Sequence, residues 1–264
     1  MHIKMIVTDL DGTLLRDDKS ISEYTREILS RCRESGIKVV CATGRGGSAD
    51  KVAPADLFDG RITMNGAAAK AGDASIYKCM IPYQIAQPIL IACDRYGLKT
   101  TSELNGMHYS NFAVPDEWAT VTNYQKVDFA NHNIDCETLY AVINSPADIL
   151  FIEEHLPGEL YMYVSRFDLA QIMHKDATKS KALSKLARLW GIDQSEIAAF
   201  GDDLNDIDLL EYAGYGVAMG NAVDDVKAAA DYICDSNEVD GVAKWLEKHL
   251  LQAQELAISS SEPH

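Results

Sequence analysis

Two carboxylates follow a short apolar run near the start of the chain. Residues 6–8 are β-branched and predict a buried strand, and Asp9 and Asp11 come directly after it. Because an unpaired carboxylate is costly to bury, both should lie at the exit of the strand, where open α/β sheets bind ligands. Carboxylates this close repel each other unless a cation lies between them, and hard oxygen ligands favour Mg²⁺. A strand that runs into an acidic turn is the alternative.

A candidate anion site follows the second predicted strand, residues 37–42. Thr43, Gly44 and Arg45 offer a hydroxyl and backbone N–H groups just before a predicted helix, an arrangement that binds anions. The segment is not a Walker loop, because the Gly-Lys-Ser/Thr ending is absent. Taken alone, these three residues are more often just a turn before a helix. Their place at the end of the strand that follows the Asp9 strand is what favours an anion site.

Carboxylates occur again at the exit of a later predicted strand, residues 197–200. Asp202 and Asp206 are four residues apart, so a helix that begins near residue 203 would bring them towards each other. An acidic helix start is the alternative. Lys179 stands at the start of the predicted helix 178–190, where a cation opposes the helix dipole. It is therefore either solvated or directed at something negative.

The elements around these residues alternate between strand and helix at both ends of the chain, and differ in the middle. Hydrophobic periodicity predicts parallel βαβ units at the two ends. In the middle of the chain, predicted hairpins, one of which turns at Asn105-Gly106, indicate antiparallel strands. The expected strands are residues 6–8, 37–42, 61–64, 98–103, 107–111, 139–143, 159–166, 169–174, 197–200, 214–222 and 231–234, with a further hairpin over residues 67–80. The expected helices are residues 22–34, 84–96, 146–156, 178–190, 223–230 and 241–250.

The sequence therefore predicts an α/β fold with two domains. Residues 1–82 and 177–264 would form a Rossmann-like parallel-sheet core with helices on both faces. Residues 83–176 would form a smaller α+β domain inserted into it. Residues 259–264 are expected to be a frayed tail.

The chain is acidic, with a formal net charge of −16 over 264 residues. This charge argues against nucleic acid or an anionic membrane as a partner, and a phosphate site would need local positive charge. The six cysteines form no C-x-x-C pair and several lie in apolar runs, so free thiols in a reducing compartment are expected. Without a signal peptide or a run of transmembrane length, a cytoplasmic monomer or homodimer is expected.

The chain resembles the haloacid dehalogenase-like hydrolase superfamily at four motifs, which occur in the family's order. They are Asp9-Leu-Asp-Gly-Thr-Leu, Thr43-Gly-Arg, Lys179 and Gly201-Asp-Asp-Leu-Asn-Asp. The steps Asn65-Gly-Ala and Val217-Ala-Met-Gly-Asn-Ala are similar to those of its Cof-type phosphatase subfamily. The resemblance covers the predicted core at both ends of the chain. Residues 83–176 resemble the family in layout only, as a cap inserted between the second and third motifs.

The resemblance implies a role for each motif residue. Asp9 would be the nucleophile that accepts the phosphoryl group, Asp11 the acid and base, and Lys179 a stabilising charge. Mg²⁺ would be held by Asp9, Asp202 and the backbone carbonyl of Asp11, with Asp206 orienting the lysine and the metal shell. The implied substrate-binding residues are Leu10, Thr43, Gly44, Arg45, Asn65 and Asn205.

The implied activity is Mg²⁺-dependent hydrolysis of a small phosphorylated metabolite through an aspartyl phosphate. The cap would set the choice of substrate. It carries five Lys/Arg and thirteen Asp/Glu, a net charge of −8, which suits a neutral leaving group such as a sugar. A phosphorylated cofactor such as pyridoxal phosphate or a flavin nucleotide comes next, followed by a sugar phosphomutase. A non-catalytic small-molecule binder is the least favoured, and receiver-like signalling domains are much shorter than this chain.

Overall fold

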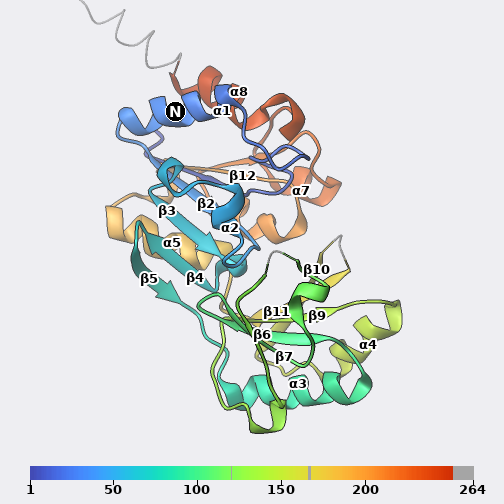
Figure 1. Ribbon diagram of the computed structural model, residues 1–264. Coiled ribbons are helices and arrows are strands. Elements are labelled where there is room, and N and C mark those ends of the chain that lie inside the picture. The colour runs from blue at the N-terminus through green and yellow to red at the C-terminus, as the bar shows by residue number, and fades with distance from the viewer. Residues whose placement is uncertain (120, 166–167, 252–264) are drawn as a thin grey trace, which may run out of the picture.

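Two separate β-sheets organise the chain (Figure 1). The structure, a computed structural model, describes residues 1–119, 121–165 and 168–251. The larger sheet has eight strands in the order β14-β13-β12-β1-β2-β3-β4-β5, and the smaller has six in the order β10-β11-β9-β6-β7-β8. Residue 166 of the expected strand 159–166 and the expected tail at 259–264 lie outside the described residues.

Six neighbouring strands of the larger sheet are parallel, and the last two, β4 and β5, form an antiparallel hairpin at one edge. The strands are β1 (Met5–Thr8), β2 (Lys38–Ala42), β3 (Gly60–Thr63), β4 (Ala68–Ala71), β5 (Ala74–Lys78), β12 (Ile197–Gly201), β13 (Tyr215–Ala218) and β14 (Tyr232–Ile233). Because β12, β1 and β2 are neighbours and run in one direction, the residues that follow them meet at one edge of the sheet.

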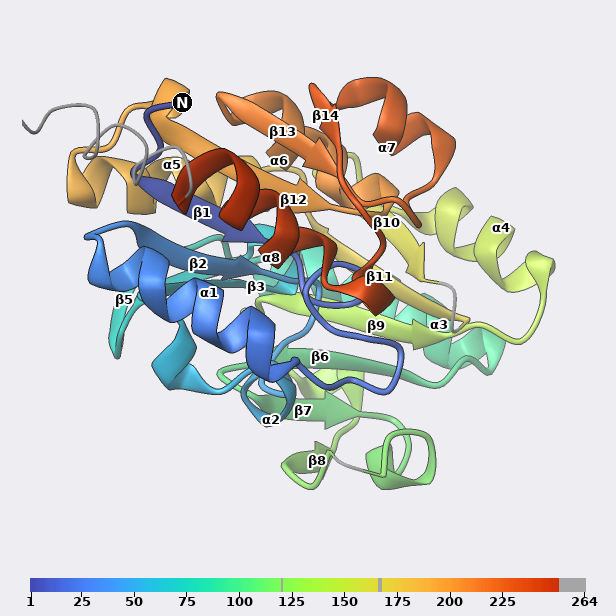
Figure 2. The ribbon, with the colours of Figure 1, turned by 90° about the horizontal axis from the view of Figure 1, so that it is seen from above.

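Helices cover both faces of the larger sheet, which confirms the predicted α/β fold (Figure 2). On one face α1 contacts α8, and on the other α5 contacts α6. The helices of this part are α1 (Glu23–Glu34), α2 (Ala49–Val52), α5 (Lys179–Trp190), α6 (Ile207–Tyr212), α7 (Asp224–Ala229) and α8 (Gly241–Leu246). Helix α1 shows why they form. Ser22 accepts a hydrogen bond from the Thr25 N–H as its N-cap, and Ile28, Leu29 and Cys32 bury one face.

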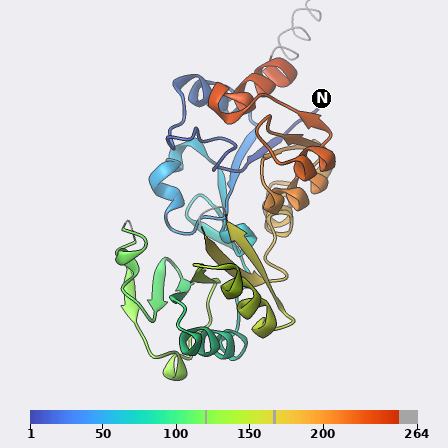
Figure 3. The same ribbon diagram turned by 90° about the vertical axis from the view of Figure 1, so that its right-hand side faces the viewer.

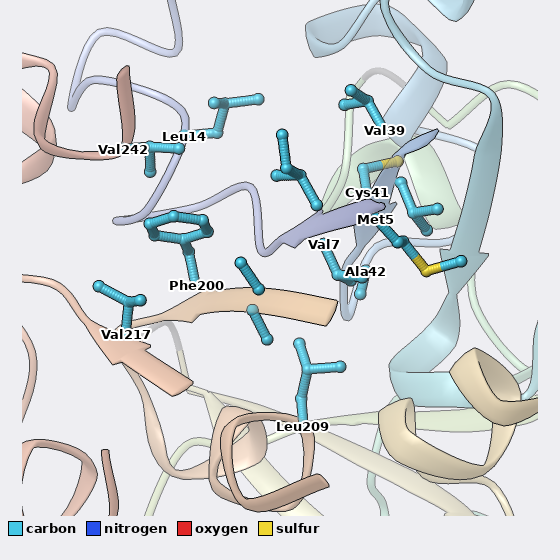
Figure 4. Packing of buried hydrophobic residues seen from close by; sticks show 14 of the residues in the cluster. Met5, Val7, Leu14, Val39, Cys41, Ala42, Phe200, Leu209, Val217 and Val242 are labelled. Carbon is cyan, nitrogen blue, oxygen red and sulfur yellow. The ribbon is translucent and has the colours of Figure 1, made fainter. Parts of the chain in front are cut away.

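The middle strands are buried on both faces. All four residues of β1 are buried, as expected for a parallel strand that helices cover on both sides. Phe200 of β12 packs edge-on against Trp245 of α8, with ring centroids 5.3 Å apart. Figure 4 shows Phe200 beside Val242, while Leu209 of α6 lies on the opposite side of the strand. Each such side chain contributes about 1.5–3 kcal/mol on burial, so the strands that carry the candidate site have a rigid base.

The smaller sheet lies beside the larger one, with its helices on the far side (Figures 1 and 3). Helices α3 and α4 contact each other and pack on the sheet through a separate hydrophobic cluster. The predicted hairpins β6–β7 and β10–β11 are antiparallel, whereas β8, which the sequence did not predict, pairs with β7 in parallel. The elements are α3 (Tyr83–Tyr96), β6 (Thr100–Leu104), β7 (Met107–Ser110), β8 (Tyr124–Lys126), β9 (Thr138–Val142), α4 (Pro146–His155), β10 (Leu160–Ser165) and β11 (Leu169–His174).

The face of the smaller sheet that is turned towards the larger one is polar. Successive residues of a strand point to opposite faces, and the pairing places Thr101, Tyr140 and Gln171 side by side on one of them. Glu103, two residues after Thr101, lies on the same face and is buried. Buried polar side chains need partners, and those of Glu103 and Gln171 include groups on the larger sheet's loops.

Two expectations from composition can be compared with the structure. All six cysteines are free, and five of them are buried, as predicted. Among the described residues, no helix has both the length and the apolar character that crossing a membrane requires.

Candidate active site

Three polar side chains meet where β1, β2 and β12 end. Asp9 follows β1, Thr43 follows β2 and Asp202 follows β12, and these strands are neighbours in the sheet. All three side chains are buried. The three segments that the sequence predicted to meet at one edge of the sheet therefore do meet there in the structure.

Lys179 enters this edge from the first turn of α5. Its ammonium Nζ lies 2.7 Å from Asp9 Oδ1 and 2.5 Å from Asp206 Oδ1, and the side chain is fully buried. Gly66 allows the approach, because it has φ +102° and a Cβ there would lie 2.1 Å from the Thr178 carbonyl oxygen. Lys179, whose position at the start of a helix opposes the helix dipole, thus points at carboxylates and not at solvent.

Asp9, Asp202 and Asp206 form a cluster in which one carboxylate oxygen of each lies within 4.8 Å of the others. Lys179 supplies one positive charge to these three carboxylates. Burial raises the pKa of Asp9, Lys179 lowers it, Asp206 and Asp202 raise it, and the net result is a pKa well above the usual value. A hard divalent cation would offset the excess negative charge, so the donor set fits Mg²⁺.

Asp202 and Asp206 have different hydrogen-bond partners at this edge. Asp202 Oδ1 accepts a hydrogen bond of 2.9 Å from the Thr13 hydroxyl. Both oxygens of Asp206 have partners: Oδ1 accepts from Lys179, and Oδ2 accepts from the backbone N–H groups of Asp202 and Asp203 at 2.9 and 3.1 Å. Asp206 thus orients Lys179 and the loop that carries Asp202, and it keeps the Asp202 carboxylate in the same cluster as Asp9.

Gly12 brings Asp202 against the loop that follows β1. It has φ +80°, and a Cβ there would lie 2.3 Å from Asp202 Oδ2. The Gly12 carbonyl accepts a hydrogen bond of 2.7 Å from the Asn221 amide, which fixes this turn from the other side. The glycine of the first motif therefore has a steric reason: only a residue without a side chain lets the carboxylate approach.

Asp11 lies at the same edge but is held by two cations. Arg45 donates through Nε to one carboxylate oxygen and through Nη2 to the other at 2.7 Å, and Lys19 Nζ donates to Asp11 Oδ1 at 2.8 Å. Burial alone would raise the pKa of Asp11, but the hydrogen bonds from Arg45 and Lys19 outweigh it and lower the pKa. Asp11 is a carboxylate in this arrangement. Sequence reasoning missed Lys19, because a lysine in a turn carries no signal of its own.

The Thr43 hydroxyl is buried at the end of β2. Its Oγ1 accepts a hydrogen bond of 3.1 Å from the Arg45 N–H, so the loop turns back on the threonine. The Leu10 side chain belongs to the hydrophobic core, and any contact of Leu10 with a ligand would come from its backbone. The predicted substrate-binding residues Thr43, Gly44 and Arg45 thus surround the same edge as Asp9 and Asp11.

Asn65 and Asn205 meet although 140 residues separate them. Asn205 Nδ2 donates to Asn65 Oδ1 at 2.8 Å, and Asn65 Nδ2 donates to Gln171 Oε1 at 2.9 Å. Asn65 is buried and has φ +50°, a strained conformation for a residue with a side chain. Gln171, on β11 of the smaller sheet, was not identified from the sequence, which shows no spacing that would link it to Asn65.

A cavity of about 520 Å³ borders this edge. Its walls include Asn65 and Asn205 from loops of the larger sheet, Lys179 from α5, and Tyr161, Met162 and Tyr163 from β10 of the smaller sheet. Its size is in the range of small-molecule sites. The cavity lies between the two sheets, next to the residues that sequence motifs singled out.

The chain was compared with protein families, characterised proteins and solved structures. The sequence pattern described as haloacid dehalogenase-like hydrolase matches residues 6–246. The 5-amino-6-(5-phospho-D-ribitylamino)uracil phosphatase YcsE of Bacillus subtilis is 32% identical over 258 residues, which cover 95% of this chain and 97% of that protein. The pyridoxal phosphate phosphatase YbhA of Escherichia coli is 27% identical over 277 residues, which cover 95% of this chain and 100% of that protein.

Among solved structures, the subclass IIB sugar phosphatase BT4131 matches with a TM-score of 0.82 and 28% identity, covering 93% of this chain and 98% of that one. The similarity therefore extends over both sheets and is not limited to the motif segments. The chain belongs to the haloacid dehalogenase-like hydrolase family and, with these relatives, to its phosphatases.

Proposed function

We propose that this protein is an Mg²⁺-dependent phosphomonoester hydrolase that acts on a small phosphorylated metabolite through an aspartyl phosphate. One observation carries the proposal. A buried aspartate, Asp9, has one oxygen fixed at 2.7 Å by a buried lysine, and Asp202 lies within metal-bridging distance of it. A nucleophile, a cation to offset phosphoryl charge and a metal position thus occur together.

The residues of this chain would divide the reaction into two displacements. In the first, Asp9 attacks phosphorus, the phosphoester bond breaks, and the leaving oxygen takes a proton from Asp11. In the second, Asp11 takes a proton from water, the water oxygen attacks phosphorus, and the aspartyl–phosphorus bond breaks to release phosphate. Lys179 and the Thr43 hydroxyl would hold the transferring group.

A metal fits beside these groups. Asp9, Asp202 and the backbone carbonyl of Asp11 would hold Mg²⁺, which needs few protein ligands because it keeps several waters. When bound, the ion neutralises charge on the carboxylates and on the phosphoryl oxygens.

Asp11 needs a change of partners before it can act as an acid, since Arg45 and Lys19 hold it ionised. We expect the phosphoryl oxygens of the substrate to attract Arg45 away from Asp11. A guanidinium binds phosphate in the same two-pronged way as it binds a carboxylate. Arg45 would then become a substrate contact, and Asp11 would be free to carry a proton.

Residues 83–176 would act as the cap, with hinges near 81–83 and 174–178 and the leaving group in the cavity next to β10. Our first candidate substrate is a sugar phosphate. The cap's net charge of −8 disfavours a second phosphate, and the similar BT4131 is a sugar phosphatase. Hydroxyl groups of a sugar could bond to Glu103 and Tyr140, which lie on the polar face of the smaller sheet.

A phosphorylated cofactor or precursor with an aromatic ring is the second candidate. Tyr161, Tyr163 and Met162 line the cavity and offer surfaces on which a planar ring packs. The similar YbhA and YcsE are phosphatases of pyridoxal phosphate and of a phosphoribityl-uracil compound.

Phosphate release from a panel of sugar phosphates, pyridoxal phosphate, flavin mononucleotide and p-nitrophenyl phosphate tests the proposal. We expect turnover with Mg²⁺, loss of turnover with EDTA, and recovery when Mg²⁺ is restored. Asp9→Asn should abolish activity, because the amide cannot attack phosphorus. Activity that persists in purified Asp9→Asn protein, or in EDTA, would contradict the proposed mechanism.

A further inference from the structure

Gln171 reaches from the smaller sheet to the loops of the larger one. Its Oε1 accepts a hydrogen bond of 2.9 Å from Asn65 Nδ2, and its Nε2 donates to the Gly44 carbonyl at 3.1 Å. The same Nε2 donates to the Tyr140 hydroxyl at 3.4 Å. The side chain is buried, and both hydrogens of its amide nitrogen have acceptors. A glutamine with these partners has little capacity left for a ligand.

The contact with Gly44 fixes one peptide unit of the candidate phosphate-binding loop. The carbonyl of the Gly44–Arg45 peptide accepts from Gln171, and the N–H of the same peptide donates to Thr43 Oγ1 at 3.1 Å. The plane of this peptide is thus held at both ends. Because Thr43 Oγ1 already accepts from that N–H, its own hydrogen is directed to another acceptor, as a phosphoryl oxygen would require.

The contact of Gln171 with Asn65 links the smaller sheet to Asn205 in the fourth motif as well. Asn65 Oδ1 accepts from Asn205 Nδ2 at 2.8 Å. Gln171 therefore contacts the loops that follow β2 and β3 directly, and through Asn65 it is connected to the segment that follows β12. Asn65 keeps its strained φ of +50° inside this arrangement, and such a conformation persists only where its surroundings hold it.

We propose that Gln171 is a positioning residue: it sets the Gly44–Arg45 peptide and the Thr43 hydroxyl for phosphoryl binding, and it does so only when the smaller sheet lies against the larger one. This inference rests on the proposed phosphatase function and goes beyond it. Closure would then do more than cover the substrate. It would complete the phosphate site, so that the site is fully formed only in the closed enzyme.

The test compares Gln171→Met, which keeps the length of the side chain and removes its hydrogen bonds, with Gln87→Met as a matched control. Gln87, on α3, donates to the Phe129 carbonyl inside the cap and does not reach the larger sheet. The measurements are kcat and KM for p-nitrophenyl phosphate and for the best metabolite substrate, and equilibrium binding of orthovanadate with Mg²⁺. Vanadate reports on the phosphoryl site without any leaving group.

We expect Gln171→Met to lower kcat by about 10- to 100-fold, by a similar factor on both substrates, and to weaken vanadate binding by a comparable factor. Gln87→Met should leave the vanadate affinity unchanged. Amide exchange gives a second readout: the Arg45 N–H should exchange faster in Gln171→Met than in wild type. If the large substrate alone is affected and vanadate binds normally, Gln171 contacts the leaving group and the inference is wrong.

A second variant, Gln171→Glu, allows the same test if Gln171→Met does not fold. Gln171→Glu keeps an acceptor for Asn65 but places a carboxylate oxygen against the Gly44 carbonyl, so it should also weaken vanadate binding. Wild-type affinity in both variants would overturn the inference while leaving the proposed function intact. Retained turnover in Asp9→Asn would instead overturn the proposed function, and the vanadate and exchange measurements would still decide the role of Gln171.

Discussion

Replacement of Lys179 by methionine would remove one positive charge from a buried cluster and leave its shape almost unchanged. Lys179 Nζ lies 2.7 Å from Asp9 Oδ1 and 2.5 Å from Asp206 Oδ1, and the side chain has no exposed surface. Removal of one partner from a buried ion pair costs about 3–5 kcal/mol, because the remaining charges are left without compensation. We expect Lys179→Met to lower the free energy of unfolding by about that amount in Mg²⁺-free buffer.

Lys181 provides a control two residues further along the same helix. Its ammonium is paired with Asp176 at 2.5 Å, but the two side chains are 51% and 61% exposed. An exposed pair contributes about 0–1 kcal/mol. Lys181→Met therefore makes the same chemical change at a similar distance from a carboxylate, and the difference between the two variants measures the effect of burial.

The loss of stability should depend on pH in a defined direction. Burial would lower the pKa of Lys179, but Asp206 and Asp9 outweigh it and raise the pKa. Its contribution is therefore present below the ordinary lysine pKa of about 10 and constant between pH 5 and 8. Without Lys179, the pKa of Asp9, which burial already raises, would rise further. A carboxyl with a raised pKa favours folding in acid and loses that contribution as pH rises. The deficit should be smaller at pH 5 than at pH 8.

Urea denaturation followed by circular dichroism at the two pH values would measure these effects. In the Lys179→Met background, Asp9→Asn removes one uncompensated charge and should restore part of the stability, with a coupling of about 0.5–3 kcal/mol. Turnover by Lys179→Met should fall on the order of 10²-fold or more, since a charge aimed at the phosphoryl group is lost. A deficit below about 1 kcal/mol at pH 8, or strictly additive effects of the two substitutions, would refute the electrostatic reasoning.

Two further substitutions test the loops and the polar face. Gly12→Ala should raise the Mg²⁺ concentration needed for half-maximal activity, because the new Cβ would displace Asp202. Gly36→Ala is the control: Gly36 has nearly the same φ as Gly12 (+82° against +80°), but the space around it is open. Gly36→Ala should therefore leave the Mg²⁺ requirement unchanged. Burial raises the pKa of Glu103, so its protonated form favours folding in acid and this contribution is lost as pH rises. Unfolding curves of Glu103→Gln should show a gain in stability over wild type that grows from pH 5 to pH 8; a constant difference would contradict this.

The edge that carries the site could be predicted because each of its parts is a local pattern. A buried strand followed by a carboxylate or a hydroxyl is visible within ten residues, and parallel strands in a βαβ series place their ends together. The positions of Asp9, Thr43 and Asp202 at this edge could be predicted without any long-range information beyond that topology. Lys179 was open to two explanations in the sequence, and the structure directs it at Asp9 and Asp206.

The contacts between the two sheets could not be predicted in the same way. Gln171 lies 106 residues from Asn65 and 127 from Gly44, and its direction depends on the pairing of β11 with β9. A shift of that pairing by one residue would turn the side chain to the opposite face. Lys19 was missed for a related reason: its approach to Asp11 depends on the positive φ of 66° in an exposed turn, which lysine rarely adopts.

Local charge explains how an acidic chain can hold a phosphate dianion. The net charge is −16, but repulsion between exposed charges is largely screened beyond about 8–10 Å, so the groups in contact with the anion decide its affinity. Lys19, Arg45 and Lys179 converge on this edge, and each is paired with Asp9 or Asp11. A phosphoryl group must therefore compete with carboxylates for these cations. A divalent ion that took over the Asp9 carboxylate would free Lys179 for the phosphoryl group, so metal and phosphate should each strengthen the binding of the other.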